Sequence, residues 1–81
     1  MKIYIAVVCD HHYDDDIQVF TNLISAMEYC KDSVPRHKTL TVKNLNTDMV
    51  NYGWRFYGTY GIEGDYVYVL ERRLKTTFVE E

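Results

Sequence analysis

The chain has 81 residues, of which 47% are hydrophobic and 15% aromatic, and this composition excludes an intrinsically disordered chain. The formal net charge of −3 argues against a nucleic-acid-binding surface, which needs clustered Lys and Arg. We therefore expect one globular domain over residues 1–81. Its eight tyrosines favour a protein partner or a homodimer, because tyrosine is enriched at interfaces.

The two cysteines, Cys9 and Cys30, each lie in an apolar segment. We expect both to be small buried hydrophobic residues, since two cysteines give no disulfide framework. The apolar run after Met1 and Lys2 is too short for a secretory signal, and no run approaches the ~20 residues that cross a bilayer. These features predict a soluble, cytoplasmic protein without membrane contact.

The first third of the chain predicts two strands and a turn. Residues 3–9 are apolar on both faces, which is typical of a central strand. Residues 10–16 are almost entirely polar and rich in Asp, so they predict a loop or hairpin turn. Residues 17–20 then form a short strand, which we expect to run antiparallel to the first.

A single long helix is predicted next. Thr21 or Asn22 supplies the cap, and apolar residues follow at spacings of four, three and four on one face. Pro35 ends the helix, because the residue before a proline avoids the α region. Residues 36–38 are then a linker to the next strand.

Three further strands are predicted in the second half, over residues 39–43, 52–60 and 66–72. Residues 61–65 contain two glycines and predict a hairpin loop between the last two strands. Two alternatives stay open for residues 44–51, where Thr47 could cap one short helical turn or the segment could be a loop. Residues 72–81 could extend the last strand, form an edge or fray.

The predicted order β-β-α-β-β-β indicates an α+β fold. We expect a two-layer sandwich, in which one helix packs on a mainly antiparallel sheet of four to five strands. Strict alternation places Trp54 with Phe56 on one face, and Tyr57 on the other. One helix cannot cover such a sheet, so we expect its uncovered, Tyr-rich and Arg-rich face to contact a partner or a second copy.

The polar loop is the first candidate for chemistry. Asp10, His11 and His12 offer ligands for a divalent metal ion. Adjacent histidines on an extended chain point to opposite sides, however, and the Asp run lacks the calcium-loop pattern. A solvated loop is the simpler interpretation, so we expect no cofactor.

Other patterns give no catalytic set. Cys9 with His11 or His12 could form a thiol and its base, but a thiol on a buried strand is usually inert. The glycines of residues 58–64 precede a strand, whereas a phosphate-binding loop precedes a helix. The aromatic residues could stack on bases, but the composition supplies no positive groove. We therefore expect that the protein is not an enzyme.

One resemblance rests on a pattern of turns and apolar positions. Residues 2–8 lead to an Asp-rich bend, then to a short strand ending at Phe20 and Thr21 and a helix carrying Ala26 and Tyr29. This pattern, with the closing strand over residues 65–71, resembles small uncharacterised accessory proteins of bacteriophages and their hosts. The resemblance implies a small α+β accessory protein and assigns no site residues.

Two functional hypotheses follow. The first is a non-enzymatic interaction module, which under the phage resemblance would modulate or inhibit a host defence protein; its predicted contact residues are Tyr13, Asp14, Asp15, Asp16, Tyr57, Tyr66 and Tyr68. The second is a metal-binding or small-ligand-binding protein, or a minor enzyme, that uses the loop of residues 10–16. Self-association through the open sheet face is compatible with both.

Overall fold

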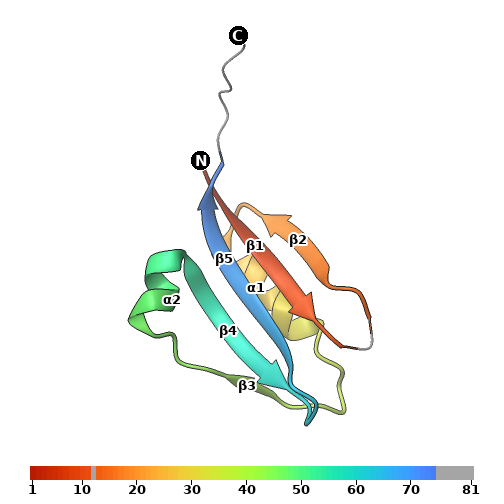
Figure 1. The fold of residues 1–81 in the computed structure, drawn as a ribbon. Helices are drawn as coiled ribbons and strands as arrows, with labels where there is room; N and C mark the ends of the chain where they lie inside the picture. The colour runs from red at the N-terminus through yellow and green to blue at the C-terminus, as the bar shows by residue number, and fades with distance from the viewer. Residues whose placement is uncertain (12, 75–81) are drawn as a thin grey trace.

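A computed structural model describes residues 1–11 and 13–74 of the chain. Its centre is one antiparallel sheet with the strand order β2-β1-β5-β4-β3 (Figure 1). The strands are β1 (Lys2–Cys9), β2 (Asp16–Phe20), β3 (Leu40–Val42), β4 (Trp54–Tyr60) and β5 (Asp65–Arg73). The helices are α1 (Leu23–Asp32) and α2 (Thr47–Tyr52). The predicted α+β class and antiparallel sheet are confirmed.

Helix α1 begins where the sequence predicts it. The side chain of Asn22 caps it by accepting a hydrogen bond of 3.1 Å from the Ser25 amide. The helix ends at Asp32, and the Ser33 hydroxyl donates to the carbonyl oxygen of Tyr29 at 2.8 Å. Ala26 lies one turn after the cap and is fully buried against the sheet.

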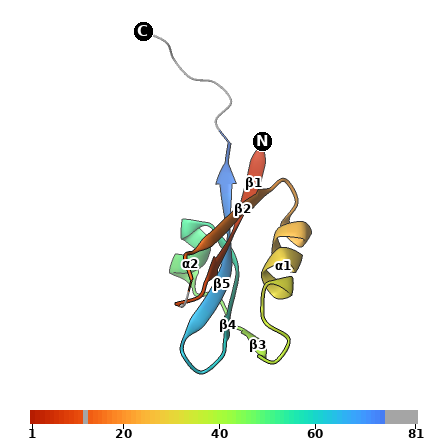
Figure 2. The same cartoon turned by 90° about the vertical axis from the view of Figure 1, so that its right-hand side faces the viewer.

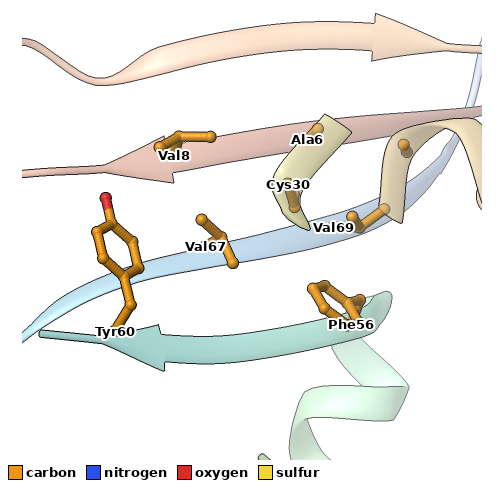
Figure 3. Close-up of a cluster of buried hydrophobic side chains, with 8 residues drawn as sticks. Ala6, Val8, Cys30, Phe56, Tyr60, Val67 and Val69 are labelled. Atoms are coloured by element: carbon orange, nitrogen blue, oxygen red, sulfur yellow. The ribbon is translucent and has the colours of Figure 1, made fainter. Parts of the chain in front are cut away.

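The hydrophobic core lies between α1 and one face of the sheet (Figure 3). Val67 and Val69 of the middle strand β5 are completely buried there, and full burial of such a side chain contributes about 1.5–3 kcal/mol. The other buried members of this core are Ala6, Val8, Ala26, Cys30, Phe56 and Tyr60. The residues between them on the strands therefore point to the opposite face.

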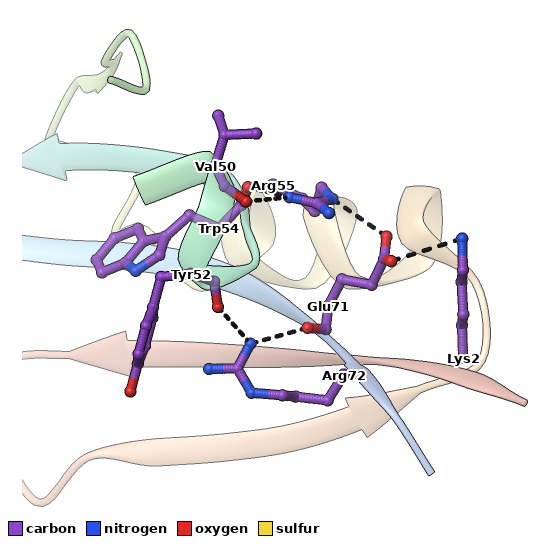
Figure 4. Close-up of polar contacts among 7 residues, drawn as sticks. All are labelled: Lys2, Val50, Tyr52, Trp54, Arg55, Glu71 and Arg72. Atoms are coloured by element: carbon purple, nitrogen blue, oxygen red, sulfur yellow. Dashed lines mark hydrogen bonds and ion pairs between the residues drawn. The ribbon is translucent and has the colours of Figure 1, made fainter. Parts of the chain in front are cut away.

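A second, short helix, α2, also forms, which is the first of the two alternatives left open for residues 44–51. Asn46 rather than Thr47 caps α2, accepting a 2.8 Å hydrogen bond from the Met49 amide, and Gly53 ends it with a φ of 112°. Helix α2 lies on the side of the sheet away from α1 (Figure 2). Arg72 fastens it by donating to the Tyr52 carbonyl at 2.8 Å (Figure 4).

The prediction that Trp54 shares a face with Phe56 is wrong, because β4 begins with a β-bulge. The pairing between β4 and β5 shifts between Trp54 and Phe56, so these two residues do not share a face. Beside the bulge, the Arg55 guanidinium donates to the Glu71 carboxylate at 3.1 Å, and Lys2 lies 3.5 Å from the same carboxylate (Figure 4). Tyr52, predicted as the first residue of this strand, belongs to α2.

Among residues 1–11 and 13–74, no helix is long and apolar enough to cross a membrane. The predicted extension or fraying beyond residue 74 lies outside the described residues.

Candidate functional site

Four aromatic side chains form a continuous cluster on the sheet face opposite α1. The rings of Trp54 and Tyr68 stack with 4.5 Å between centroids, and those of Tyr66 and Tyr68 with 5.9 Å. Tyr57 meets Trp54 and Tyr66 edge-on at 5.4 and 6.3 Å. We call Trp54, Tyr57, Tyr66 and Tyr68 the aromatic face. Tyr66 is 37% exposed and the other three rings are half-buried, so a partner can reach them.

The register of two strands explains this cluster. Tyr57 of β4 pairs with Tyr68 of β5, and Thr59 pairs with Tyr66, so alternation directs the three tyrosines to one face. The structure thus brings together three of the predicted contact residues. Sequence reasoning missed Trp54, since strict alternation without the bulge places it on the other face.

Aliphatic side chains continue the aromatic face across the sheet. Tyr68 pairs with Val7 of β1, which pairs in turn with Ile17 of the edge strand β2. Ile17 and its same-face neighbour Val19 are 57% and 59% exposed. Apolar side chains therefore lie in register from β4 to β2, with Val7 buried between the aromatic face and the exposed Ile17 and Val19.

The acidic loop borders one end of this surface. Tyr13, Asp14 and Asp15 are exposed. The negative charge of Asp15 reaches the aromatic face: a hydrogen bond to Cys9 raises the pKa of Tyr66 to about 12, and Asp15 adds to that rise. Burial raises the pKa of Tyr68, and Asp15 again contributes.

Asp16 behaves differently from its neighbours. Its carboxylate accepts hydrogen bonds from the Tyr29 hydroxyl and from the Gln18 side-chain amide, on the α1 side of the sheet. The bond from Tyr29 lowers the pKa of Asp16, with help from Gln18. Asp16 therefore anchors β2 to α1, and its predicted role in partner binding remains a prediction.

A second cluster joins the polar loop to the hairpin between β4 and β5. The His11 backbone amide donates to Asp65 Oδ1 at 3.1 Å, and His11 Nδ1 lies 2.9 Å from the same oxygen. His11 Nε2 lies 3.3 Å from Glu63 Oε1. The hydrogen bond to Asp65 raises the pKa of His11, and the charges of Glu63, Asp65 and Asp10 add to this.

Asp65 is the buried member of the cluster, with its side chain 1% exposed. Its second oxygen, Oδ2, lies 3.5 Å from Lys38 Nζ and makes no hydrogen bond within the described part of the chain. This contact is an ion pair without directed hydrogen-bond geometry. Hydrogen bonds from the His11 side chain and backbone lower the pKa of Asp65, which keeps a charged carboxylate in a buried position.

A pocket of about 240 Å³ is lined in part by Asp10, His11 and Asp65. Its wall also includes Cys9, whose pKa is raised by burial and whose thiol is therefore a poor nucleophile. Cys9 pairs with Tyr66 across the sheet, whereas Asp65 is the preceding residue on β5 and points to the other face. The structure thus gives no support to a thiol activated by His11.

The predicted metal candidates are only partly assembled. Ligand atoms of Asp10, His11 and Asp65 all lie within 4.8 Å of one another, while His12 lies outside the described residues. Sequence reasoning missed Asp65 and Glu63, because both were assigned to a hairpin loop on account of its glycines. Nothing local in the sequence signals a contact between residues that lie 54 positions apart.

Comparisons of the chain with protein-family models, with curated proteins and with solved structures gave no match. The two surfaces are therefore interpreted from their own geometry and chemistry.

Proposed function

We propose that this protein is a non-enzymatic interaction module that binds a partner protein through its aromatic face. The observation that carries this proposal is the contiguous packing of Trp54, Tyr57, Tyr66 and Tyr68 on a sheet face that α1 does not cover. Tyr and Trp offer large contact areas with few rotatable bonds, and they dominate the energetics of interfaces. These rings are already ordered by mutual stacking, which lowers the entropy that binding would cost.

The side chains on and around the aromatic face indicate what kind of protein surface would bind there. An apolar centre extends to Ile17 and Val19, and a negative rim comes from Asp14 and Asp15. The complementary surface is apolar and bordered by Lys or Arg, since opposite potentials steer encounter and fix register. A nucleic acid would be repelled by the same rim, because base-stacking platforms need a positive groove.

The resemblance to small phage proteins selects the first class of partner to test. Under that resemblance the partner is a host protein, such as a defence nuclease or its regulator. The protein would then act in the host cytoplasm by modulating or inhibiting that partner.

A matched pair of exposed aliphatic residues tests the proposal. Val19 on β2 and Ile24 on α1 are both 59% exposed, and they lie on opposite sides of the sheet. The wild-type chain, Val19→Glu, Tyr66→Ala and Ile24→Glu would each be immobilised and used to capture host proteins, with quantitation against an empty matrix. We expect a specific protein to be lost with Val19→Glu and Tyr66→Ala and retained with Ile24→Glu.

Light scattering at several concentrations, with and without chelator, identifies self-association on the same samples. A dimer that Val19→Glu dissociates and Ile24→Glu leaves intact would assign the face to a second copy of this chain. Equal capture by all four proteins, with a monomeric mass throughout, would overturn the proposal.

A further inference from the structure

The geometry points to a binding site for one divalent transition-metal ion, such as Zn²⁺, beside His11, with His11 Nε2 and Glu63 as ligands and Asp10 as the third ligand. This inference is independent of the aromatic face and of any partner protein. It differs from a site within the polar loop alone, because Glu63 comes from the hairpin between β4 and β5 and Asp65 from the start of β5.

The first argument is the spacing of the two principal ligand atoms. His11 Nε2 and Glu63 Oε1 lie 3.3 Å apart. Two ligands on a tetrahedral ion with bonds of about 2.1 Å are separated by about 3.4 Å. An ion can therefore replace the direct contact between these atoms with almost no movement of either side chain, and both side chains are about half exposed and accessible from solvent.

The second argument is the buried carboxylate behind the imidazole. Asp65 Oδ1 lies 2.9 Å from His11 Nδ1, and this contact orients the ring so that Nε2 lies towards Glu63. Metal-binding histidines commonly donate their other ring N–H to such a carboxylate, which orients the ring and raises its basicity. The backbone amide of His11 also bonds to Asp65, so the ring is held from two directions.

The third argument is charge. Asp10, Glu63 and Asp65 place three carboxylates around one imidazole, and Lys38 Nζ lies 3.5 Å from Asp65 Oδ2. Lys38 compensates the buried carboxylate on the inner side of the cluster. Asp10 and Glu63 are more exposed than Asp65, and their carboxylate oxygens are suitable ligands for Zn²⁺. A carboxylate oxygen of Asp10 lies within 4.8 Å of a His11 ring nitrogen and of an Asp65 carboxylate oxygen, and we infer that Asp10 supplies the third ligand.

Isothermal titration of ZnCl₂ into the full chain at pH 7.5, in a buffer that does not chelate, tests the site. We expect one ion per chain. His11→Ala and Glu63→Gln should abolish or strongly weaken binding. Glu63→Gln replaces a half-exposed side chain, whereas His11→Ala also removes a partner of the buried Asp65. His37→Ala is the matched control, because His37 is exposed and lies outside the cluster.

The Asp65→Asn variant tests whether Asp65 supports metal binding by orienting the His11 ring and not as a ligand itself. It keeps the ligands and should weaken Zn²⁺ binding about 10–100-fold, the usual effect of losing a partner of a metal-bound histidine. Circular dichroism would show that each variant is folded. If a variant is unfolded, Glu63→Gln alone decides the question. Binding that is unchanged in His11→Ala and Glu63→Gln, or that is lost equally in His37→Ala, would indicate adventitious ions only and overturn the inference.

Discussion

The indole ring of Trp54 stacks on the phenol ring of Tyr68, with 4.5 Å between centroids and 25° between planes. The stack joins the bulged start of β4 to the middle strand of the sheet. Trp54 is the single tryptophan of the chain, so its emission reports directly on the aromatic face. This makes the face measurable before any partner is known.

Replacing Tyr68 with Leu should increase the mobility and solvent exposure of the Trp54 indole ring. The substitution keeps apolar bulk but removes the ring pairing, so we expect a loss of about 1 kcal/mol in the free energy of unfolding. Trp54 emission should shift to longer wavelength, and acrylamide should quench it more strongly. Tyr13→Leu serves as the control, because Tyr13 is 77% exposed and lies in the loop. An unchanged emission spectrum in Tyr68→Leu would contradict the stacked geometry.

Alanine substitutions at two glycines with positive φ distinguish the cost of backbone strain from the cost of steric crowding. A Cβ on Gly64, at φ +86°, meets nothing within 4 Å, so Gly64→Ala should cost only about 1 kcal/mol of strain. A Cβ on Gly53, at φ +112°, would lie 2.8 Å from the Glu71 carbonyl oxygen and 2.2 Å from the Arg72 guanidinium. Gly53→Ala should therefore cost clearly more, because backbone atoms must shift and Arg72 is displaced from the end of α2.

Urea unfolding of the two glycine variants measures this difference. The wild-type chain supplies the reference, and equal midpoints for both variants would show that the crowding at Gly53 is relieved without cost. A larger loss in Gly64→Ala would contradict the structural account of both turns.

Local patterns in the sequence predicted much of the fold, and the exceptions have physical causes. Alternation predicted that Tyr66 and Tyr68 share one face of β5 and that Tyr57 lies on the face of β4 away from Phe56, because side chains on a regular strand alternate. The same rule failed at Trp54, since a bulge depends on how the partner strand pairs. Helix α2 was left open between two alternatives because six residues carry little periodicity, although its cap at Asn46 follows the usual preference.

The site was harder to predict than the fold. The Asp/His-rich loop attracted attention through its composition, but the residue that organises it is Asp65, from the start of β5. An Asp beside a Gly in a hairpin is ordinarily a turn residue, so its burial could not be anticipated. Contact between His11 and Asp65 depends on the pairing of β1 with β5, which closes only in the folded sheet.

The bond between Tyr29 and Asp16 makes stability depend on pH in a defined direction. The Tyr29 hydroxyl is the main cause of the lowered pKa of Asp16 in the folded chain. An unfolded Asp has a pKa of about 3.9, so the stabilisation is complete above that value and is lost as the pH falls through the lower folded pKa. Tyr29→Phe should therefore lower the melting temperature most near neutral pH, while its ring still packs on Phe20.

The difference between wild-type chain and Tyr29→Phe is the quantity to follow, from pH 7 to pH 3. Asp65 and Glu71 also have lowered pKa values, and their acid sensitivity affects both proteins equally. We expect the gap in melting temperature to be constant above about pH 5 and to close towards pH 3, as Asp16 is protonated. Tyr13→Phe, which changes an exposed hydroxyl, should show no gap at any pH. A gap in Tyr29→Phe that persisted unchanged at pH 3 would mean that the hydroxyl acts through packing and not through the carboxylate.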